Sequence, residues 1–135
     1  MSSIDHLGIA VRSLATAKKF YQSLGLKVIS EEVVAHEHVR VAMLPVGETR
    51  IELLEATSED SAVARFIGRR GEGLHHVALQ VEDLSATVEQ LKRNGTRLIS
   101  DEIKVGAGGH LYVFVHPSAA GGVLLELCED PPQGV

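Results

Sequence analysis

One stretch of the sequence occurs twice. Residues 4–32 begin IDHLGIAV and residues 74–102 begin LHHVALQV, and the two stretches align at a constant offset of 70 without a gap. Identical residues coincide along both copies: His6 with His76, Val11 with Val81, Leu14 with Leu84, Gly25 with Gly95, Ile29 with Ile99, Ser30 with Ser100, and Glu32 with Glu102. Chance similarity does not hold one register over such a length, so the chain is an internal duplication, and this limits the folds that are open to it.

A second pair of matching segments lies further along the chain. RIELLE at 50–55 aligns with LLELCE at 124–129 at an offset of 74, so four residues are inserted in the second copy. Each copy begins with an alternating strand and continues with a helix whose N-cap is Ser13 or Asp83. Three further strands follow in each copy: about 26–34, 38–45 and 49–56, then about 96–103, 110–116 and 122–129.

Both helices carry an apolar stripe at helical spacing, which should pack against the strands. The stripes consist of Leu14, Ala17, Phe20, Tyr21 and Leu24 in the first copy, and of Leu84, Val88 and Leu91 in the second. A small unit with one apolar face has to bury that face, and the nearest partner is its own twin.

These patterns predict an α+β fold of two tandem βαβββ modules. The modules cover about residues 4–56 and 74–129, and the linker 57–73 contains a short helix at 60–70. We expect a single domain of residues 1–135, in which eight strands form a half-barrel with the helices outside. Its cleft would be lined by equivalent positions of both copies.

The repeat also singles out four polar residues. His6 matches His76, and Glu52 matches Glu126. Two imidazoles and two carboxylates suit one borderline divalent metal ion, with Co, Zn, Ni and Mn as the candidates. A carboxylate inside an apolar strand is costly to bury unless it is paired or metal-bound. The alternative without a metal has both histidines hydrogen-bonded in the core and both glutamates on an exposed strand face.

The neighbours of the two histidines favour a cavity. Gly8 and Ala10 share the strand face of His6, and Ala78 and Gln80 share the face of His76, because alternate residues of a strand point to the same side. Large apolar residues occupy the opposite face of each strand, where the helices should pack.

Composition excludes several classes of function. The formal net charge of −5 and the absence of a basic block argue against binding to nucleic acid. The apolar runs are too short to span a membrane, and no signal peptide precedes the first strand pattern. Cys128 is the only cysteine, which fits a reducing compartment. We therefore expect a cytoplasmic protein.

Five segments carry a family resemblance that extends from residue 4 to residue 129: DHLGIAV, VRVAMLPVGETRIELLE, GEGLHHVALQV, DEIKVGAGG and HPSAAGGVLLEL. With them the chain resembles the vicinal oxygen chelate (glyoxalase) superfamily, which is built from paired βαβββ modules around a divalent metal. Within that superfamily it is most similar to the methylmalonyl-CoA epimerases. Two positions depart from that family. Arg40 stands where some epimerases have a catalytic glutamate, with glutamine then at the position of Glu52, and Ser118 replaces a frequent lysine.

The resemblance implies an isomerase that interconverts the two C2 epimers of methylmalonyl-CoA, and it implies a homodimer. The metal ligands would be His6, Glu52, His76 and Glu126. Inverting C2 needs acid–base groups on opposite faces of a planar carbanion, and Glu52 and Glu126 are expected to be those catalytic groups. Three residues are expected at the acyl-CoA: Arg40 at an anionic group, Lys104 at the CoA phosphates, and Gly108 in a turn beside the substrate.

Other functions remain open from the sequence. Glyoxalase I has the same ligand set and proton-transfer chemistry, although its usual DPDGY-like turn is here HPSAAGG. A non-haem iron dioxygenase fits less well, because such enzymes use two histidines and one carboxylate, and here Glu52 adds a further ligand. A non-catalytic small-molecule-binding protein of the same fold needs no ligand quartet at all.

Overall fold

A computed structural model of the protein describes residues 2–131. Its elements follow one another in the predicted order, β-α-β-β-β in each copy with a helix between the copies, and the α+β class is confirmed. The elements are β1 Ser3–Ala10, α1 Leu14–Ser23, β2 Ser30–Val34, η1 Ala35–Glu37, β3 Val39–Val46, β4 Thr49–Ala56, α2 Ala62–Arg70, β5 Gly73–Gln80, α3 Leu84–Arg93, β6 Lys104–Val105, η2 Ala107–Gly109, β7 Leu111–Val115, η3 Pro117–Ala119 and β8 Leu125–Glu129.

The described residues divide into two compact units. One unit is His6–His75, and the other joins the described part of Met1–Asp5 to that of His76–Val135. We call β1 to β4 with α1 module 1, and β5 to β8 with α3 module 2. Among residues 2–131, no helix is both long and apolar enough to cross a membrane.

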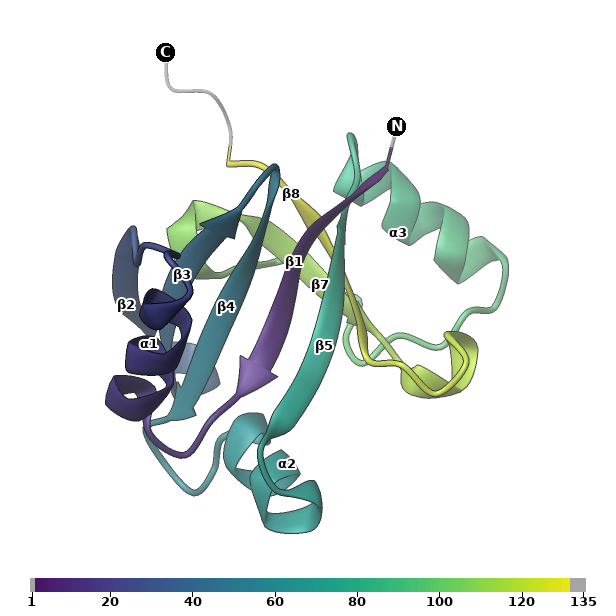
Figure 1. Cartoon of the computed structure of the whole chain (residues 1–135). Helices are drawn as coiled ribbons and strands as arrows, with labels where there is room; N and C mark the ends of the chain where they lie inside the picture. The colour runs from purple at the N-terminus through teal and green to yellow at the C-terminus, as the bar shows by residue number, and fades with distance from the viewer. Residues whose placement is uncertain (1, 132–135) are drawn as a thin grey trace. The chain divides into compact units, whose positions relative to one another are not determined.

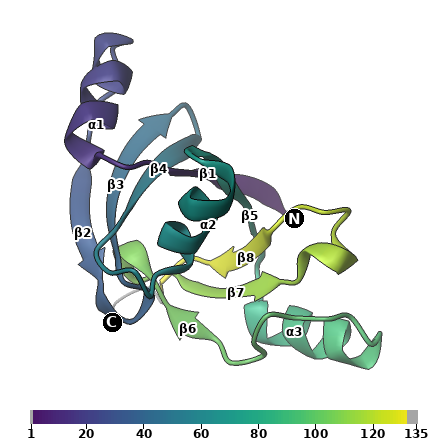
Figure 2. The same cartoon turned by 90° about the horizontal axis from the view of Figure 1, so that it is seen from below.

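Module 1 is a four-stranded sheet in the order β2-β3-β4-β1. β1 and β4 are parallel, while β3 is antiparallel to both β2 and β4. Helix α1 packs against β3 and β4 (Figure 1), and α2 packs against β4 (Figure 2). The core between α1 and the sheet is formed by Val11, Leu14, Ala42, Leu44 and Leu53.

Module 2 repeats this arrangement with β5, β8, β7 and β6 in that order. β5 and β8 are parallel, and β7 is antiparallel to β8 and β6. The core against α3 is formed by Leu84, Val88, Val113, Val115 and Leu127. Leu53 and Leu127 are therefore equivalent core positions. They are separated by 74 residues, which is the offset that the four-residue insertion predicts.

The N-terminus of each first helix is held in the same way. The Ser13 hydroxyl accepts a hydrogen bond from the Thr16 N–H, and the Asp83 carboxylate accepts one from the Ala86 N–H, as the sequence predicts. A second acceptor comes from the last strand of each module. Glu55 accepts from the Leu14 N–H at 2.8 Å, and Glu129 accepts from the Leu84 N–H at 2.8 Å. Carboxylates at these ends also complement the helix dipole.

Two expectations about local structure are wrong. Residues 96–103 are not a strand: apart from an isolated bridge between Leu98 and Val115, regular pairing begins only at Lys104 opposite Tyr112. From the bridge at Leu98 to the pairing at Lys104 the chain advances six residues, while its partner strand moves only three, from Val115 to Tyr112. The hydrogen-bond ladder therefore cannot stay continuous between them.

The other wrong expectation concerns the stripe of α1. Leu14 is buried and Ala17 and Tyr21 join the core, but Phe20 and Leu24 are 59% and 61% exposed. Leu24 is the C-cap residue, beyond the last residue of the helix, and the Phe20 ring packs edge-on against Tyr21 of the same helix.

Candidate metal centre

Module 1 holds a histidine and a glutamate in contact. His6 lies on β1 and Glu52 on the parallel neighbour β4, where the register places Glu52 opposite Gly8. His6 Nδ1 is 3.3 Å from Glu52 Oε2. Both residues are buried, with 3% and 6% of their surface exposed. The strand pairing therefore brings together two residues that are far apart in the sequence.

Module 2 holds the matching pair. His76 Nε2 is 3.2 Å from Glu126 Oε1, and both residues are buried. Here Glu126 is opposite Ala78 in the register. Phe114, which pairs with Glu126 across β7 and β8, meets the His76 ring edge-on at a centroid distance of 5.4 Å. This contact holds the imidazole plane from one side.

The small residues predicted on the histidine face are directly opposite the glutamates. Gly8 faces Glu52 and Ala78 faces Glu126, and both Gly8 and Ala78 are buried. A larger side chain at either position would compete with the carboxylate for the same space. The small side chains thus leave room for the histidine and the glutamate to reach each other.

The two pairs fit the donors of a divalent metal. Each offers one imidazole nitrogen and one carboxylate oxygen within 3.3 Å, away from bulk water. Nitrogen and oxygen donors of this kind bind Zn and the neighbouring first-row divalent ions. The alternative that places both glutamates on an exposed strand face is excluded, because Glu52 and Glu126 are only 6% and 9% exposed.

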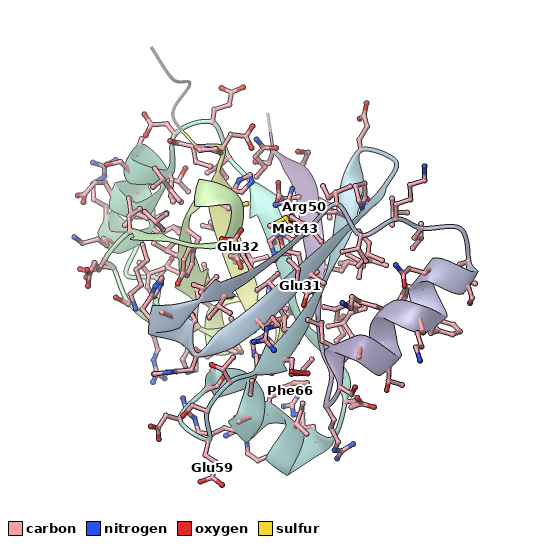
Figure 3. All side chains as sticks on the ribbon, turned by 90° about the vertical axis from the view of Figure 1, so that its left-hand side faces the viewer. Glu31, Glu32, Met43, Arg50, Glu59 and Phe66 are labelled. Carbon is pink, nitrogen blue, oxygen red and sulfur yellow. The ribbon has the colours of Figure 1, made fainter. Side chains whose placement is uncertain are left out.

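A cation that the sequence analysis did not single out lies beside the first pair. Arg50 Nε donates a hydrogen bond to Glu52 Oε2 at 3.2 Å, and the arginine side chain is only 18% exposed. Figure 3 labels Arg50 next to Met43, the residue that pairs with Glu52 across β3 and β4. The spacing carried a signal for this contact, since residues 50 and 52 of one strand share a face.

Arg40 lies on the other face of the module 1 sheet. It pairs with Glu55 across β3 and β4, and Arg40 Nη1 is 3.8 Å from Glu55 Oε1. Glu55 binds the helix α1, so this is the α1 side, whereas Glu52 points to the opposite side. The arginine side chain is 45% exposed. The structure does not bring Arg40 to Glu52, and its contact with substrate stays a prediction.

Lys104 and Gly108 belong to one hairpin of module 2. Lys104 pairs with Tyr112, and Tyr112 pairs with Cys128 of β8, which shares a strand face with Glu126. Lys104 therefore lies on the Glu126 face of the sheet. Gly108 is in the turn between β6 and β7 with a φ of 69°, a conformation that favours glycine. Their contacts with a substrate also stay predictions.

The family of the chain follows from its similarity to known proteins. A model of the glyoxalase/bleomycin resistance protein/dioxygenase superfamily matches residues 5–114. Human mitochondrial methylmalonyl-CoA epimerase is 37% identical over 129 residues, which cover 94% of this chain and 73% of the human protein. This chain belongs to the methylmalonyl-CoA epimerase family.

Two further members of the family extend the comparison. The ethylmalonyl-CoA/methylmalonyl-CoA epimerase of Cereibacter sphaeroides is 35% identical and covers 92% of this chain and 95% of its own. A methylmalonyl-CoA epimerase solved in complex with methylmalonyl-CoA and NH4+ superposes with a TM-score of 0.93 at 36% identity. That superposition covers 98% of this chain and 96% of the other. The predicted fold class and the family resemblance are both confirmed.

Proposed function

We propose that this protein is a metal-dependent epimerase that interconverts the two C2 epimers of methylmalonyl-CoA. The observation that carries the proposal is the buried histidine–glutamate pair, which occurs once in each module of a chain of this family. The relatives named as methylmalonyl-CoA epimerases support the substrate, since they match the chain over nearly its whole length.

The metal ligands in this proposal are His6, Glu52, His76 and Glu126. Together they supply two nitrogens and two oxygens to one divalent ion, with Co, Zn, Ni and Mn as the candidates. When bound, such an ion stabilises the negative charge that develops on the thioester oxygen as the C2 proton leaves. The sequence repeat supports a shared ion, because both pairs occupy equivalent positions of their modules.

The two glutamates are the proposed acid–base groups. Epimerisation needs one group to take the C2 proton from one face of the substrate and another to return a proton to the opposite face. A duplicated fold provides two carboxylates of the same kind, Glu52 and Glu126. Each lies against a histidine, which orients the carboxylate in the absence of substrate. Burial keeps water away from the carbanion formed between the two steps.

Lys104 and Gly108 are the proposed contacts to the CoA part of the substrate. The register places Lys104 on the Glu126 face, where an ammonium group can meet a phosphate. At Gly108 the absence of a side chain would let an anionic ligand approach the backbone of the turn closely. We further propose a cytoplasmic homodimer.

Hydrogen exchange at C2 tests this function. Metal-loaded protein and a chelator-treated control are incubated with methylmalonyl-CoA in deuterated water, and the C2 proton is followed by NMR. We expect rapid loss of the C2 proton with metal, no acceleration with chelator, and recovery when the metal is restored. Folded, metal-loaded protein that does not accelerate exchange would overturn the proposal. Activity on a glutathione hemithioacetal would then assign the site to a glyoxalase I-type reaction.

A further inference from the structure

We propose that Arg50 is a positioning residue that fixes the Glu52 carboxylate, whereas Leu124 stands at the equivalent position of module 2. The two glutamates are then held differently: a cation two residues away on the same strand contacts Glu52, and the residue equivalent to that cation in module 2 is a leucine. This inference rests on the proposed function for its catalytic meaning, although the contact itself stands without it.

The contact joins two charged groups and is largely shielded from water. Arg50 Nε and His6 Nδ1 approach the same oxygen, Glu52 Oε2, at 3.2 Å and 3.3 Å. A hydrogen bond between ionised partners is roughly twice as strong as a neutral one, and the 18% exposure of Arg50 limits its screening. Glu52 is thus held from two directions, by the ring on β1 and by the guanidinium on its own strand.

The repeat shows that this arrangement is confined to module 1. At the offset of 74 that aligns Glu52 with Glu126, Arg50 aligns with Leu124. A leucine side chain has neither charge nor a hydrogen-bond donor. Leu124 O accepts a hydrogen bond from the Val77 N–H at 3.2 Å, one residue before β8 begins, whereas Arg50 lies within β4 and pairs with His6. The charged contact to the glutamate therefore comes from a side chain that module 2 does not carry at the aligned position.

Groups that hold a metal ligand in place set the geometry of the whole site. Their removal typically costs about 10- to 100-fold in metal affinity or activity, because the ligand must then be ordered when the ion binds. Arg50 should act in this way on Glu52. Its loss should loosen the pair in module 1 and leave the pair in module 2 unchanged.

Arg50→Leu, which copies the residue of module 2, gives the first test. In metal-free protein, the ring nitrogens of His6 and His76 are followed by 15N NMR, with assignments from His6→Asn and His76→Asn. We expect Arg50→Leu to shift the His6 signals and leave the His76 signals in place. Equal shifts at both histidines, or no shift at either, would overturn the proposal. This readout needs neither metal nor substrate, so it is independent of the proposed function.

Cobalt binding gives the second test. The apoprotein is titrated with Co²⁺ and followed by visible absorption, and we expect Arg50→Leu to bind about 10- to 100-fold more weakly. Arg50→Lys keeps a cation with donors, so its affinity should return to within about threefold of the native value. Arg65→Leu removes the same charge from an exposed position on α2, where Arg65 binds a backbone oxygen, and should bind Co²⁺ as the native protein does.

Two outcomes would overturn the positioning role. Native affinity in Arg50→Leu would mean that Glu52 needs no clamp, and tighter binding would mean that Arg50 competes with the ion for the carboxylate. If Arg50→Leu does not fold, as judged by circular dichroism, Arg50→Gln takes its place in both tests, and Arg50→Lys stays as the variant that keeps the cation. If the native protein binds Co²⁺ but exchanges no C2 proton, the proposed function fails while the role of Arg50 at Glu52 stands.

Discussion

The two modules share their histidine–glutamate contact and the glutamate at the helix N-terminus, but they differ in the residues and strands around these contacts. Both place a histidine on the first strand against a glutamate on the last, at 3.3 Å and 3.2 Å. Both also use the glutamate three residues further on to hold the N-terminus of the helix. One strand therefore carries a site residue on one face and a helix anchor on the other. The last strand of each module thus carries both the contact to the histidine and the contact to the helix N-terminus.

The differences lie around this shared frame. Module 1 has the five-residue strand β2, whereas module 2 has only the two-residue β6 and a bridge at Leu98. Arg50 contacts Glu52, but Leu124 occupies the matching place in module 2. His6 meets its glutamate through Nδ1 and His76 through Nε2. Both modules therefore bring a histidine into contact with a glutamate, but the atoms in contact and the neighbouring residues differ.

The largest expected effect comes from the glutamates themselves. Glu52→Gln should slow C2 exchange of one epimer, and Glu126→Gln should slow that of the other, each by about 100- to 10,000-fold because a general acid–base group is lost. Exchange is measured by NMR with the separate R and S substrates in deuterated water. Metal content is checked for each variant. If either variant exchanges both epimers at the native rate, the two modules do not share the proton transfer.

The equivalent core leucines give the next largest effect. Leu53→Ala and Leu127→Ala should each lower the free energy of unfolding by about 2–5 kcal/mol, because each leaves a cavity. Leu53 is fully buried and Leu127 is 6% exposed, so the loss at Leu53 should be the greater. Urea denaturation measures both. Val46→Ala, at a position 41% exposed, serves as the control and should change stability by less than about 0.5 kcal/mol. A larger loss at Leu127 would contradict this order.

The helix anchors should show a smaller and similar effect. Glu55→Gln and Glu129→Gln keep an acceptor but remove the charge at the N-terminus of α1 or α3, so each should cost about 0.3–1 kcal/mol. The loss should shrink in high salt, which screens the helix dipole. Denaturation at low and high salt tests this comparison. An unchanged stability for only one of the two variants would show that the modules anchor their helices differently.

The duplication made much of the fold predictable from the sequence. A residue that recurs at the same strand position in both copies is expected to have the same structural role, and this criterion singled out His6, Glu52, His76 and Glu126 as candidate ligands. The same criterion missed Arg50, because Arg50 aligns with a leucine, Leu124, and only residues that match in both copies were considered as candidates. It also produced the wrong strand at 96–103. Ser30 and Glu32 lie in β2, while the identical Ser100 and Glu102 lie outside any strand, because the register of β7 shifts beside them.

Arg40 shows a further limit of the sequence. The family resemblance led us to expect Arg40 at the substrate, but the strand period places it on the α1 side with Glu55. Facing direction depends on the register of β3 against β4, and one residue of shift reverses it. The register of β3 against β4 could not be predicted from the sequence. The face of Arg50 could be predicted, because Arg50 and Glu52 are two residues apart on one strand.

We propose above that the two pairs bind one metal ion together, and the number of metal ions per chain tests this proposal. Metal content per chain is measured by mass spectrometry after equilibration with Co²⁺, for the native protein, His6→Ala and His76→Ala. We expect one ion per chain in the native protein and a large loss of metal in both variants. Two ions per native chain, or one ion retained when either histidine is removed, would show that each pair acts alone.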